Sequence, residues 1–129
     1  MFDFMSCMTY APYMKPIEKP LVWVESETKT HLLSRSDRHH AGVLLRKLQH
    51  GENIAMPHSR PMPSIGHRCH ELRINGDAGD WRIICRIDED AIVILDVFLK
   101  KTRRTPKRVI DASKARLREY EATYRGRLP

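Results

Sequence analysis

The fold of this 129-residue chain is decided by residues 70–99, HELRINGDAGDWRIICRIDEDAIVILDVFL. Polar and apolar residues alternate over residues 70–74, and residues 81–88 and 91–99 are rich in the β-branched and aromatic side chains that strands favour. The residues between these stretches include the Asn, Gly and Asp that form tight turns. The segment therefore predicts three consecutive antiparallel strands, a meander.

One more strand and two helices are predicted around the meander. Residues 21–24 are β-formers that are apolar at successive positions, which is typical of a strand buried on both faces. Residues 36–50 have the apolar spacing of a helix, with Ser36 as its cap and a glycine after its end. A threonine–proline pair at 105–106 begins a second helix that extends to about residue 124.

The elements form a single α+β domain. We expect an irregular leader over residues 1–19, the domain over 20–124 and a tail over 125–129. The proline-rich residues 51–66 are predicted to be a loop. A meander needs a cover for its apolar face, so the predicted architecture is an antiparallel meander plus an N-terminal strand, with the helices packed on one face.

Composition excludes several classes of protein. The longest apolar run, residues 91–95, is too short to cross a bilayer, and the start Met1-Phe2-Asp3-Phe4 lacks the positive charge of a signal peptide. Three scattered cysteines do not make a disulfide framework, which favours reduced thiols in the cytoplasm. We therefore expect a cytoplasmic domain with no membrane partner.

Positive charge is concentrated in one segment. The chain has a formal charge of +7, and residues 100–118 alone carry +8, so the rest of the chain is nearly neutral. Cations near the end of a helix favour its dipole, but this does not explain the basic residues that precede the second helix. The asymmetry points to a polyanion, and nucleic acid is the commonest one.

Alternation along the strands places six charged side chains on one face. They are Glu71, Arg73, Arg82, Arg86, Asp96 and Lys100. The opposite face is predicted to be apolar, with Val93, Leu95, Val97 and Leu99 of the last strand in one continuous row. The simpler interpretation of the charged face is the solvated side of an antiparallel sheet. The sharper interpretation is a site for RNA chemistry.

Cleavage of RNA by its own 2′-hydroxyl needs a base, cations that stabilise the phosphorane, and an acid for the leaving oxygen. Glu71 is the first candidate for the base. His70 is a second, although alternation turns it to the apolar side unless a bulge intervenes. Arg73, Arg82 and Lys100 are placed to bind the phosphate, and this chemistry requires neither a metal nor another cofactor.

Two alternative interpretations concern histidines, cysteines and tryptophans. His67, Cys69 and His70 lie close in the sequence, with Cys85 on the next strand, but their spacing does not match a zinc motif. We therefore predict no metal site. Trp23 and Trp81 are predicted to lie in the core or at its edge; the alternative for Trp81, which precedes Arg82, is that it stacks on a nucleobase.

Four motifs, in this order, resemble the phage-related HigB-like branch of the RelE/ParE toxin superfamily over residues 20–122. The motifs are Pro61-Met62-Pro63-Ser64-Ile65-Gly66, Glu71-Leu72-Arg73-Ile74, Trp81-Arg82-Ile83-Ile84-Cys85-Arg86, and Phe98-Leu99-Lys100-Lys101-Thr102 with Thr105-Pro106.

The resemblance implies a RelE-like fold and the toxin of a type II toxin–antitoxin system. RelE-type relatives cut mRNA in the ribosomal A site by a metal-independent 2′-hydroxyl mechanism, and HigB-type antitoxins usually carry a helix-turn-helix domain. The basic strand residues of the family fall on Arg73 and Arg82. This chain departs from the pattern at Glu71, where better-studied members are basic, and its late tyrosines, Tyr120 and Tyr124, have no secure match.

We therefore predict an mRNA interferase whose partners are mRNA, the ribosome and an antitoxin. The predicted catalytic residues are Glu71, Arg73, Arg82 and Lys100, with His70 as a further candidate. The predicted RNA-binding residues are Arg86, Lys101, Thr102, Arg103, Arg104, Lys107 and Arg108. The alternatives are a ParE-like toxin that inhibits DNA gyrase and an inactive, phage-derived RNA-binding protein.

Overall fold

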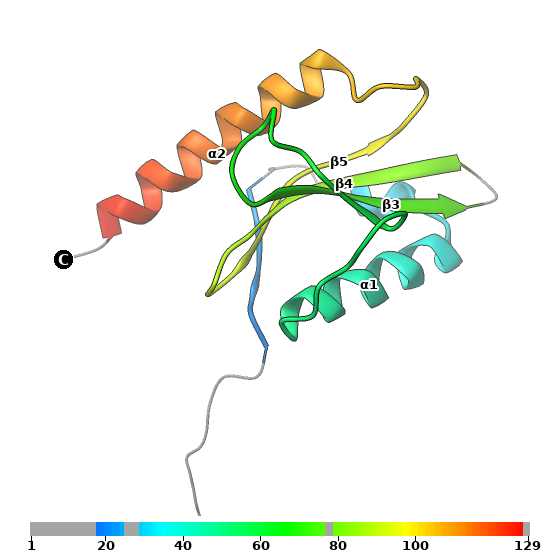
Figure 1. Ribbon diagram of the computed structural model, residues 1–129, viewed down its shortest axis with the longest axis horizontal. Helices are drawn as coiled ribbons and strands as arrows, with labels where there is room; N and C mark the ends of the chain where they lie inside the picture. Colours follow the sequence, from blue (N-terminus) through cyan, green and yellow to red (C-terminus); the bar gives the residue numbers. More distant parts are fainter. Residues whose placement is uncertain (1–17, 25–28, 77–78, 128–129) are drawn as a thin grey trace, which may run out of the picture.

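The computed structural model describes residues 18–24, 29–76 and 79–127, which form one five-stranded sheet with a long helix on each side (Figure 1). The elements in chain order are β1 (Leu21–Trp23), the 3-10 helix η1 (Lys29–Leu32), α1 (Arg35–Gln49), β2 (Ser59–Pro61), β3 (Cys69–Gly76), β4 (Gly79–Ile87), β5 (Ile92–Leu99) and α2 (Lys107–Arg127). The predicted α+β class, the meander and the N-terminal strand are confirmed.

The strands lie in the order β1-β5-β4-β3-β2. β1 is parallel to β5, and the other neighbouring pairs are antiparallel. Most of the leader predicted for residues 1–19 lies outside the described residues. The tail predicted for residues 125–129 begins within α2, which ends at Arg127 instead of near residue 124.

The two helices cover opposite faces of the sheet, so the expectation that both lie on one face was wrong (Figure 1). Leu44 and Leu48 of α1 pack in one buried cluster with Leu72 and Ile83. The other cluster joins α2 to the far face of the sheet through Val109, Leu117, Ile84, Val93 and Leu95. Because β4 and β5 carry apolar side chains on both faces, the sheet needs two covers.

A β-bulge in β5 explains why its apolar residues serve both cores. Ile84 pairs with Asp96, but the next residue, Cys85, pairs with Ile94, so Leu95 is the extra residue. Val97 therefore faces α1, whereas Leu95 faces α2. The single apolar row predicted for residues 93, 95, 97 and 99 does not exist, because the bulge reverses the alternation within it.

The bulge is tied to α2 by a long side chain. Arg116 Nη1 donates a 2.8 Å hydrogen bond to the carbonyl oxygen of Leu95, and it lies 3.4 Å from Asp96 Oδ2. Asp96 Oδ1 in turn accepts from the backbone N–H of Val97 at 2.8 Å. These bonds satisfy backbone groups at the irregularity and hold the middle of α2 against β5.

Three local predictions need correction. Ser34, not Ser36, caps α1, where its side chain accepts from the backbone N–H of Asp37 at 3.1 Å. Residues 51–66 are not all loop, because β2 pairs with β3 at the sheet edge, where a proline is tolerated. Trp23, predicted to lie in the core or at its edge, is 38% exposed at the end of the edge strand β1 and is outside the core, whereas Trp81 is buried in the core on the α1 side.

Candidate functional site

The six charged residues predicted to share a face point to the side of the sheet that α2 covers. Strand pairing places Glu71, Arg73 and Arg82 with Ile84, which belongs to the core beneath α2. This face is not a solvated one, since Glu71, Arg82, Arg86 and Asp96 are all buried. The simpler interpretation from the sequence is therefore wrong, because α2 and the chain leading to it lie over these side chains.

Three cations converge on one buried carboxylate, in what we call the Glu71 cluster. Glu71 Oε1 lies 3.9 Å from Arg73 Nε, 3.7 Å from Arg82 Nε and 3.8 Å from Lys100 Nζ. The other carboxylate oxygen, Oε2, accepts a 2.5 Å hydrogen bond from Thr105 Oγ1. Residues from β3, from β4, from the position just after β5 and from the segment before α2 thus meet at one point, and the predicted grouping of Glu71, Arg73, Arg82 and Lys100 is present.

The Glu71 cluster contains hydrogen-bond donors that its own carboxylate does not satisfy. The distances to Glu71 Oε1 are those of ion pairs and are too long for hydrogen bonds. Arg73 Nε and Arg82 Nε are buried and have no acceptor among the described residues. Buried donors without acceptors are costly, so the cluster is suited to an anion whose oxygens approach more closely than Glu71 does.

Crowding of positive charge is visible in the pKa values. Burial lowers the pKa of Lys100; Glu71 opposes this, and the neighbouring Arg82, Arg73 and Arg60 add to it. Burial likewise lowers the pKa of Arg82, again with Glu71 opposing. Three cations and one carboxylate leave a net positive charge here, so a bound anion would stabilise the protonated form of Lys100.

The two candidates for a general base are placed very differently. The Glu71 side chain has no exposed surface, so a base role requires the carboxylate to leave its present position. His70 lies on the α1 side, where its Nδ1 is 3.3 Å from Ser59 Oγ, and burial lowers its pKa. β3 pairs with β4 without a register shift, so no bulge turns His70 towards the cluster. Both roles stay predictions.

Sequence reasoning missed Arg60. This residue pairs with Glu71 across β2 and β3, and it lines a pocket of about 290 Å³ together with Ser64, Arg104 and Thr105. Thr105, predicted as a helix start, is also a partner of the cluster. Arg60 was not predicted because residues 51–66 were expected to form a loop. The sequence feature that could have identified it is the proline at position 61, since proline is tolerated in an edge strand.

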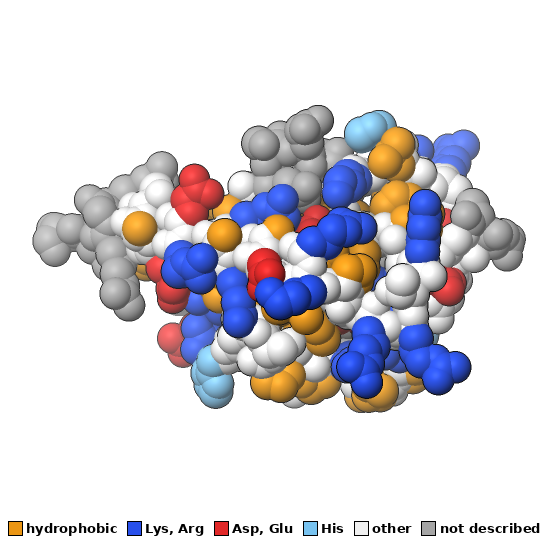
Figure 2. Space-filling model, turned by 90° about the horizontal axis from the view of Figure 1, so that it is seen from above, with side chains coloured by type: hydrophobic (Ala, Val, Ile, Leu, Met, Phe, Trp, Pro, Cys, Tyr) orange, Lys and Arg blue, Asp and Glu red, His pale blue; other side chains and the backbone are white. Residues whose placement is uncertain are grey.

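The basic residues that lead into α2 are mostly exposed. Residues 101–104 lie on the surface, where Thr102 Oγ1 donates to the carbonyl oxygen of Arg104 at 2.6 Å. Lys107 forms an i, i+4 ion pair of 2.8 Å with Asp111, and Arg108 is exposed. Figure 2 views the molecule from the α2 side and shows Lys and Arg side chains over much of this face, with hydrophobic side chains between them.

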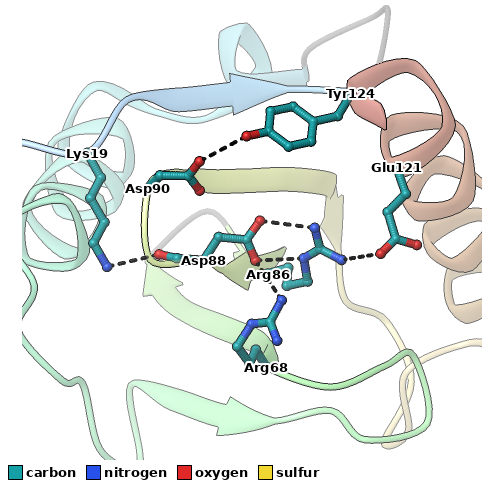
Figure 3. A network of polar contacts seen from close by, with 7 residues as sticks. All are labelled: Lys19, Arg68, Arg86, Asp88, Asp90, Glu121 and Tyr124. Carbon is teal, nitrogen blue, oxygen red and sulfur yellow. Dashed lines mark hydrogen bonds and ion pairs between the residues drawn. The ribbon is translucent and has the colours of Figure 1, made fainter. Parts of the chain in front are cut away.

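Arg86 lies outside the Glu71 cluster, in a second network that joins the end of β4 to α2 (Figure 3). Its guanidinium lies 2.8 Å from Asp88 Oδ1 and donates to Glu121 Oε2 at 3.0 Å. Arg68 reaches the same Asp88 at 3.2 Å. Burial lowers the pKa of Arg86 and the two acids raise it, with a net rise. These contacts give Arg86 a structural role; its predicted RNA contact stays untested.

The late tyrosines belong to this second network. Arg86 lies over the ring of Tyr120, 5.9 Å from its centroid. Tyr124 Oη lies 3.4 Å from Asp90 Oδ2 (Figure 3). Lys19 Nζ adds a 2.9 Å bond to the carbonyl oxygen of Asp88. The structure therefore places neither tyrosine with the Glu71 cluster.

Two further observations concern metals and membranes. Within the described ranges, no group of three or more His, Cys, Asp and Glu side chains is arranged to hold a metal ion. Cys69 and Cys85 are buried thiols, and burial raises the pKa of Cys85 to about 12. In the same residues, neither α1 nor α2 is long and apolar enough to cross a bilayer.

One family model matches the chain. It is described as phage derived protein Gp49-like (DUF891), and the match covers residues 31–118, from η1 through most of α2, including every residue of the Glu71 cluster. No curated protein matches the chain. Because the match covers more than half of the sequence, the chain belongs to the Gp49-like family of phage-derived proteins, part of the RelE/ParE-like toxin superfamily.

Proposed function

We propose that the protein is the toxin of a type II toxin–antitoxin system and that it cleaves ribosome-bound mRNA. Membership of a toxin-like family supports the first part. The observation that carries the second part is the Glu71 cluster, in which three cations surround one carboxylate and two guanidinium donors lack an acceptor. The order of the sequence motifs favours the HigB-like branch.

In the proposed reaction a phosphodiester of mRNA binds at the exposed rim of the cluster. Arg73 is 22% exposed at this rim, and Arg60 and Arg104 line the neighbouring pocket. The 2′-oxygen of the RNA attacks phosphorus and the bond to the 5′-oxygen breaks, which leaves a 2′,3′-cyclic phosphate and a 5′-hydroxyl. Cations held in fixed positions stabilise the additional negative charge of the transition state.

The two proton transfers are assigned to the centre of the cluster. Glu71 takes the proton of the 2′-hydroxyl, after phosphate has replaced it as the partner of the cations. Lys100, which the bound phosphate keeps protonated, gives its proton to the leaving 5′-oxygen.

The exposed basic residues 101, 103, 104 and 108 are proposed to bind ribosomal RNA, which carries the phosphates that such residues attract. An antitoxin with a helix-turn-helix domain is the proposed regulator. An acidic segment of this antitoxin would cover the same residues and exclude RNA from them by direct competition.

The decisive experiment uses purified protein, ribosomes programmed with a defined mRNA, and a chelator. We expect mRNA cut in the A site, with 5′-hydroxyl ends. Arg73→Ala and Lys100→Ala should each lower the cleavage rate by about 100-fold, because the first removes a cation from the transition state and the second removes the proposed acid. Arg46→Ala, on the exposed side of α1, is the matched control and should cut normally.

Intact mRNA, under conditions in which a RelE-type toxin cuts, would refute the proposal. Induction of the gene in cells gives a second readout, in which translation should fail before DNA supercoiling changes. The reverse order would favour a ParE-like gyrase inhibitor. Normal growth in the absence of an antitoxin would indicate an inactive protein.

A further inference from the structure

A second pocket lies beside the Glu71 cluster, where β4 begins and β5 ends. It has a volume of about 400 Å³, and its walls include Trp81, Phe98 and Leu99, with Leu32, Lys101 and Arg108 also lining it. We infer that this pocket seats one unpaired nucleobase of the RNA strand whose phosphate lies at the Glu71 cluster. This inference rests on the proposed function and adds a base-binding site to it.

The lining of the pocket matches the chemistry of a nucleotide. Aromatic and aliphatic side chains form the walls; Trp81 and Phe98 are largely covered by the core, at 7% and 4% exposed, whereas Leu32 is 59% exposed at the surface. Every nucleobase has a flat apolar face that stacks on such walls, while the cations Lys101 and Arg108 attract the phosphates on either side. No acidic side chain lines the pocket among the described residues, so nothing there repels the strand.

The pocket and the Glu71 cluster are built from neighbouring residues of the same strands. Arg82 belongs to the cluster and the preceding residue, Trp81, lines the pocket. Likewise Lys100 belongs to the cluster and the following residue, Lys101, lines the pocket. Phe98 pairs directly with Arg82. Because successive side chains of a strand point to opposite faces, Trp81 and Leu99 line the pocket from the α1 side and Phe98 from the α2 side, so an RNA strand bound at the cluster reaches the pocket around the end of β5.

The side-chain lining of the pocket favours a base over a peptide as its occupant. An extended peptide binds most readily by adding to a free strand edge. β4 occupies one edge of β5 as far as Leu99, and the N–H of Lys100 donates to the carbonyl oxygen of Asp80 at 2.7 Å, whereas β1 pairs with the other edge only at Ile92–Ile94. The pocket instead offers side-chain walls and a rim of cations, which suits a base with its phosphates.

The test measures binding of short single-stranded RNAs by fluorescence anisotropy. The RNAs carry 2′-O-methyl groups, which prevent cleavage, and one set has an abasic residue at each position in turn. We expect the intact RNA to bind about tenfold more tightly than the RNA that is abasic at the seated position, since one stacked base contributes about that much.

Leu32→Glu places a carboxylate at the exposed side of the pocket and should abolish this tenfold difference. Val43→Glu is the matched control, because Val43 is an apolar residue on α1 that is 39% exposed, and it should retain the difference. The comparison of intact with abasic RNA within each variant removes the general electrostatic effect of the new acid.

A second readout uses tryptophan fluorescence. The chain has two tryptophans, so a Trp23→Phe protein reports on Trp81 alone, and RNA should quench its emission. Equal affinity for intact and abasic RNAs at every position would overturn the inference and leave the proposed function standing. Quenching by poly-glutamate but not by RNA would overturn it in favour of a protein partner. Failure to bind any of the short RNAs would also overturn the inference, whereas only failure to cut ribosome-bound mRNA would refute the proposed function itself.

Discussion

Thr105 Oγ1 donates a 2.5 Å hydrogen bond to Glu71 Oε2, which lies 34 residues earlier in the chain. The bond links the middle of β3 to the residue pair that precedes α2. Because Lys100 also approaches Glu71, the exposed basic residues between Lys100 and Thr105 are anchored to one buried carboxylate at both ends. These positive charges therefore lie on a loop that is held at both ends, and not on a flexible tail.

Glu71→Gln should destabilise the fold strongly. The substitution keeps the size of the side chain but leaves three cations without their carboxylate, and removal of one partner from a buried ionic group costs about 3–5 kcal/mol. Urea unfolding measures the loss. Inorganic phosphate should restore stability more in the variant than in the natural protein, because it replaces the missing negative charge.

Asp111→Asn is the control for Glu71→Gln. It breaks the exposed ion pair with Lys107 and should leave the unfolding midpoint unchanged. A Glu71→Gln protein as stable as the natural one would show that the carboxylate does not hold the cations in place.

Arg86→Ala should weaken the attachment of α2 to the sheet. Asp88 and Glu121 would lose their shared partner, and we expect a loss of about 2–3 kcal/mol, reduced from the fully buried case because Glu121 is partly exposed. Arg68→Ala, which removes an exposed partner of Asp88, should cost much less. If Arg86→Ala instead weakened RNA binding and left stability unchanged, Arg86 would be the RNA ligand that the sequence predicts.

Gly76→Ala should destabilise the β3–β4 hairpin. A Cβ atom at this position would lie 2.0 Å from Oδ1 of the buried Asp37, so the added methyl group forces a shift that we expect to cost about 1–3 kcal/mol. The double variant with Asp37→Ala should recover part of the loss in urea unfolding. Gly42→Ala is the control: it meets nothing within 4 Å and should stabilise α1 by about 0.5–1 kcal/mol.

Stability should fall in mildly acidic solution through His70. Burial lowers the pKa of His70 below 6.5, so the unfolded chain binds a proton at a higher pH than the folded protein does. The contribution of neutral His70 to the free energy of unfolding is therefore fully present above the pKa of the unfolded chain. It is lost as the pH falls towards the pKa of His70 in the folded protein. His70→Gln should lose less stability than the natural protein between about pH 7.5 and pH 5.5, the range in which histidine titrates.

Unfolding at the two pH values measures this difference, and the same change at the exposed His39 controls for the loss of any histidine. An equal pH dependence in the natural protein and His70→Gln would contradict the prediction.

The meander was predictable because alternation and turn residues are local signals. The same local logic placed Arg73, Arg82 and Lys100 together, since neither the β3–β4 pairing nor the β5 residues beyond Asp96 include the bulge. The prediction failed for the apolar row that contains Leu95. The bulge at this residue depends on packing against α2, and the side chain of Leu95 itself gives no sign of it.

Burial of the charged face could not be predicted from the sequence for a related reason. Nothing in the sequence around Glu71 distinguishes an exposed carboxylate from a buried one; the difference lies in Thr105 and α2, which pack above it. Arg60 was missed because three residues of an edge strand carry too little pattern to separate them from a loop. Both the burial of Glu71 and the strand conformation around Arg60 depend on contacts with residues far away in the chain, which local sequence patterns do not reveal.

The double-sided use of β5 has a consequence for synthesis of the chain. The sheet precedes α2 in the sequence, so it leaves the ribosome while Val93 and Leu95 still lack their cover. Thr105, which completes the Glu71 cluster, emerges with α2. A nascent chain therefore carries an exposed apolar face and an unfinished site until the last helix docks, and a truncated product that ends after β5 should aggregate instead of folding as a smaller domain.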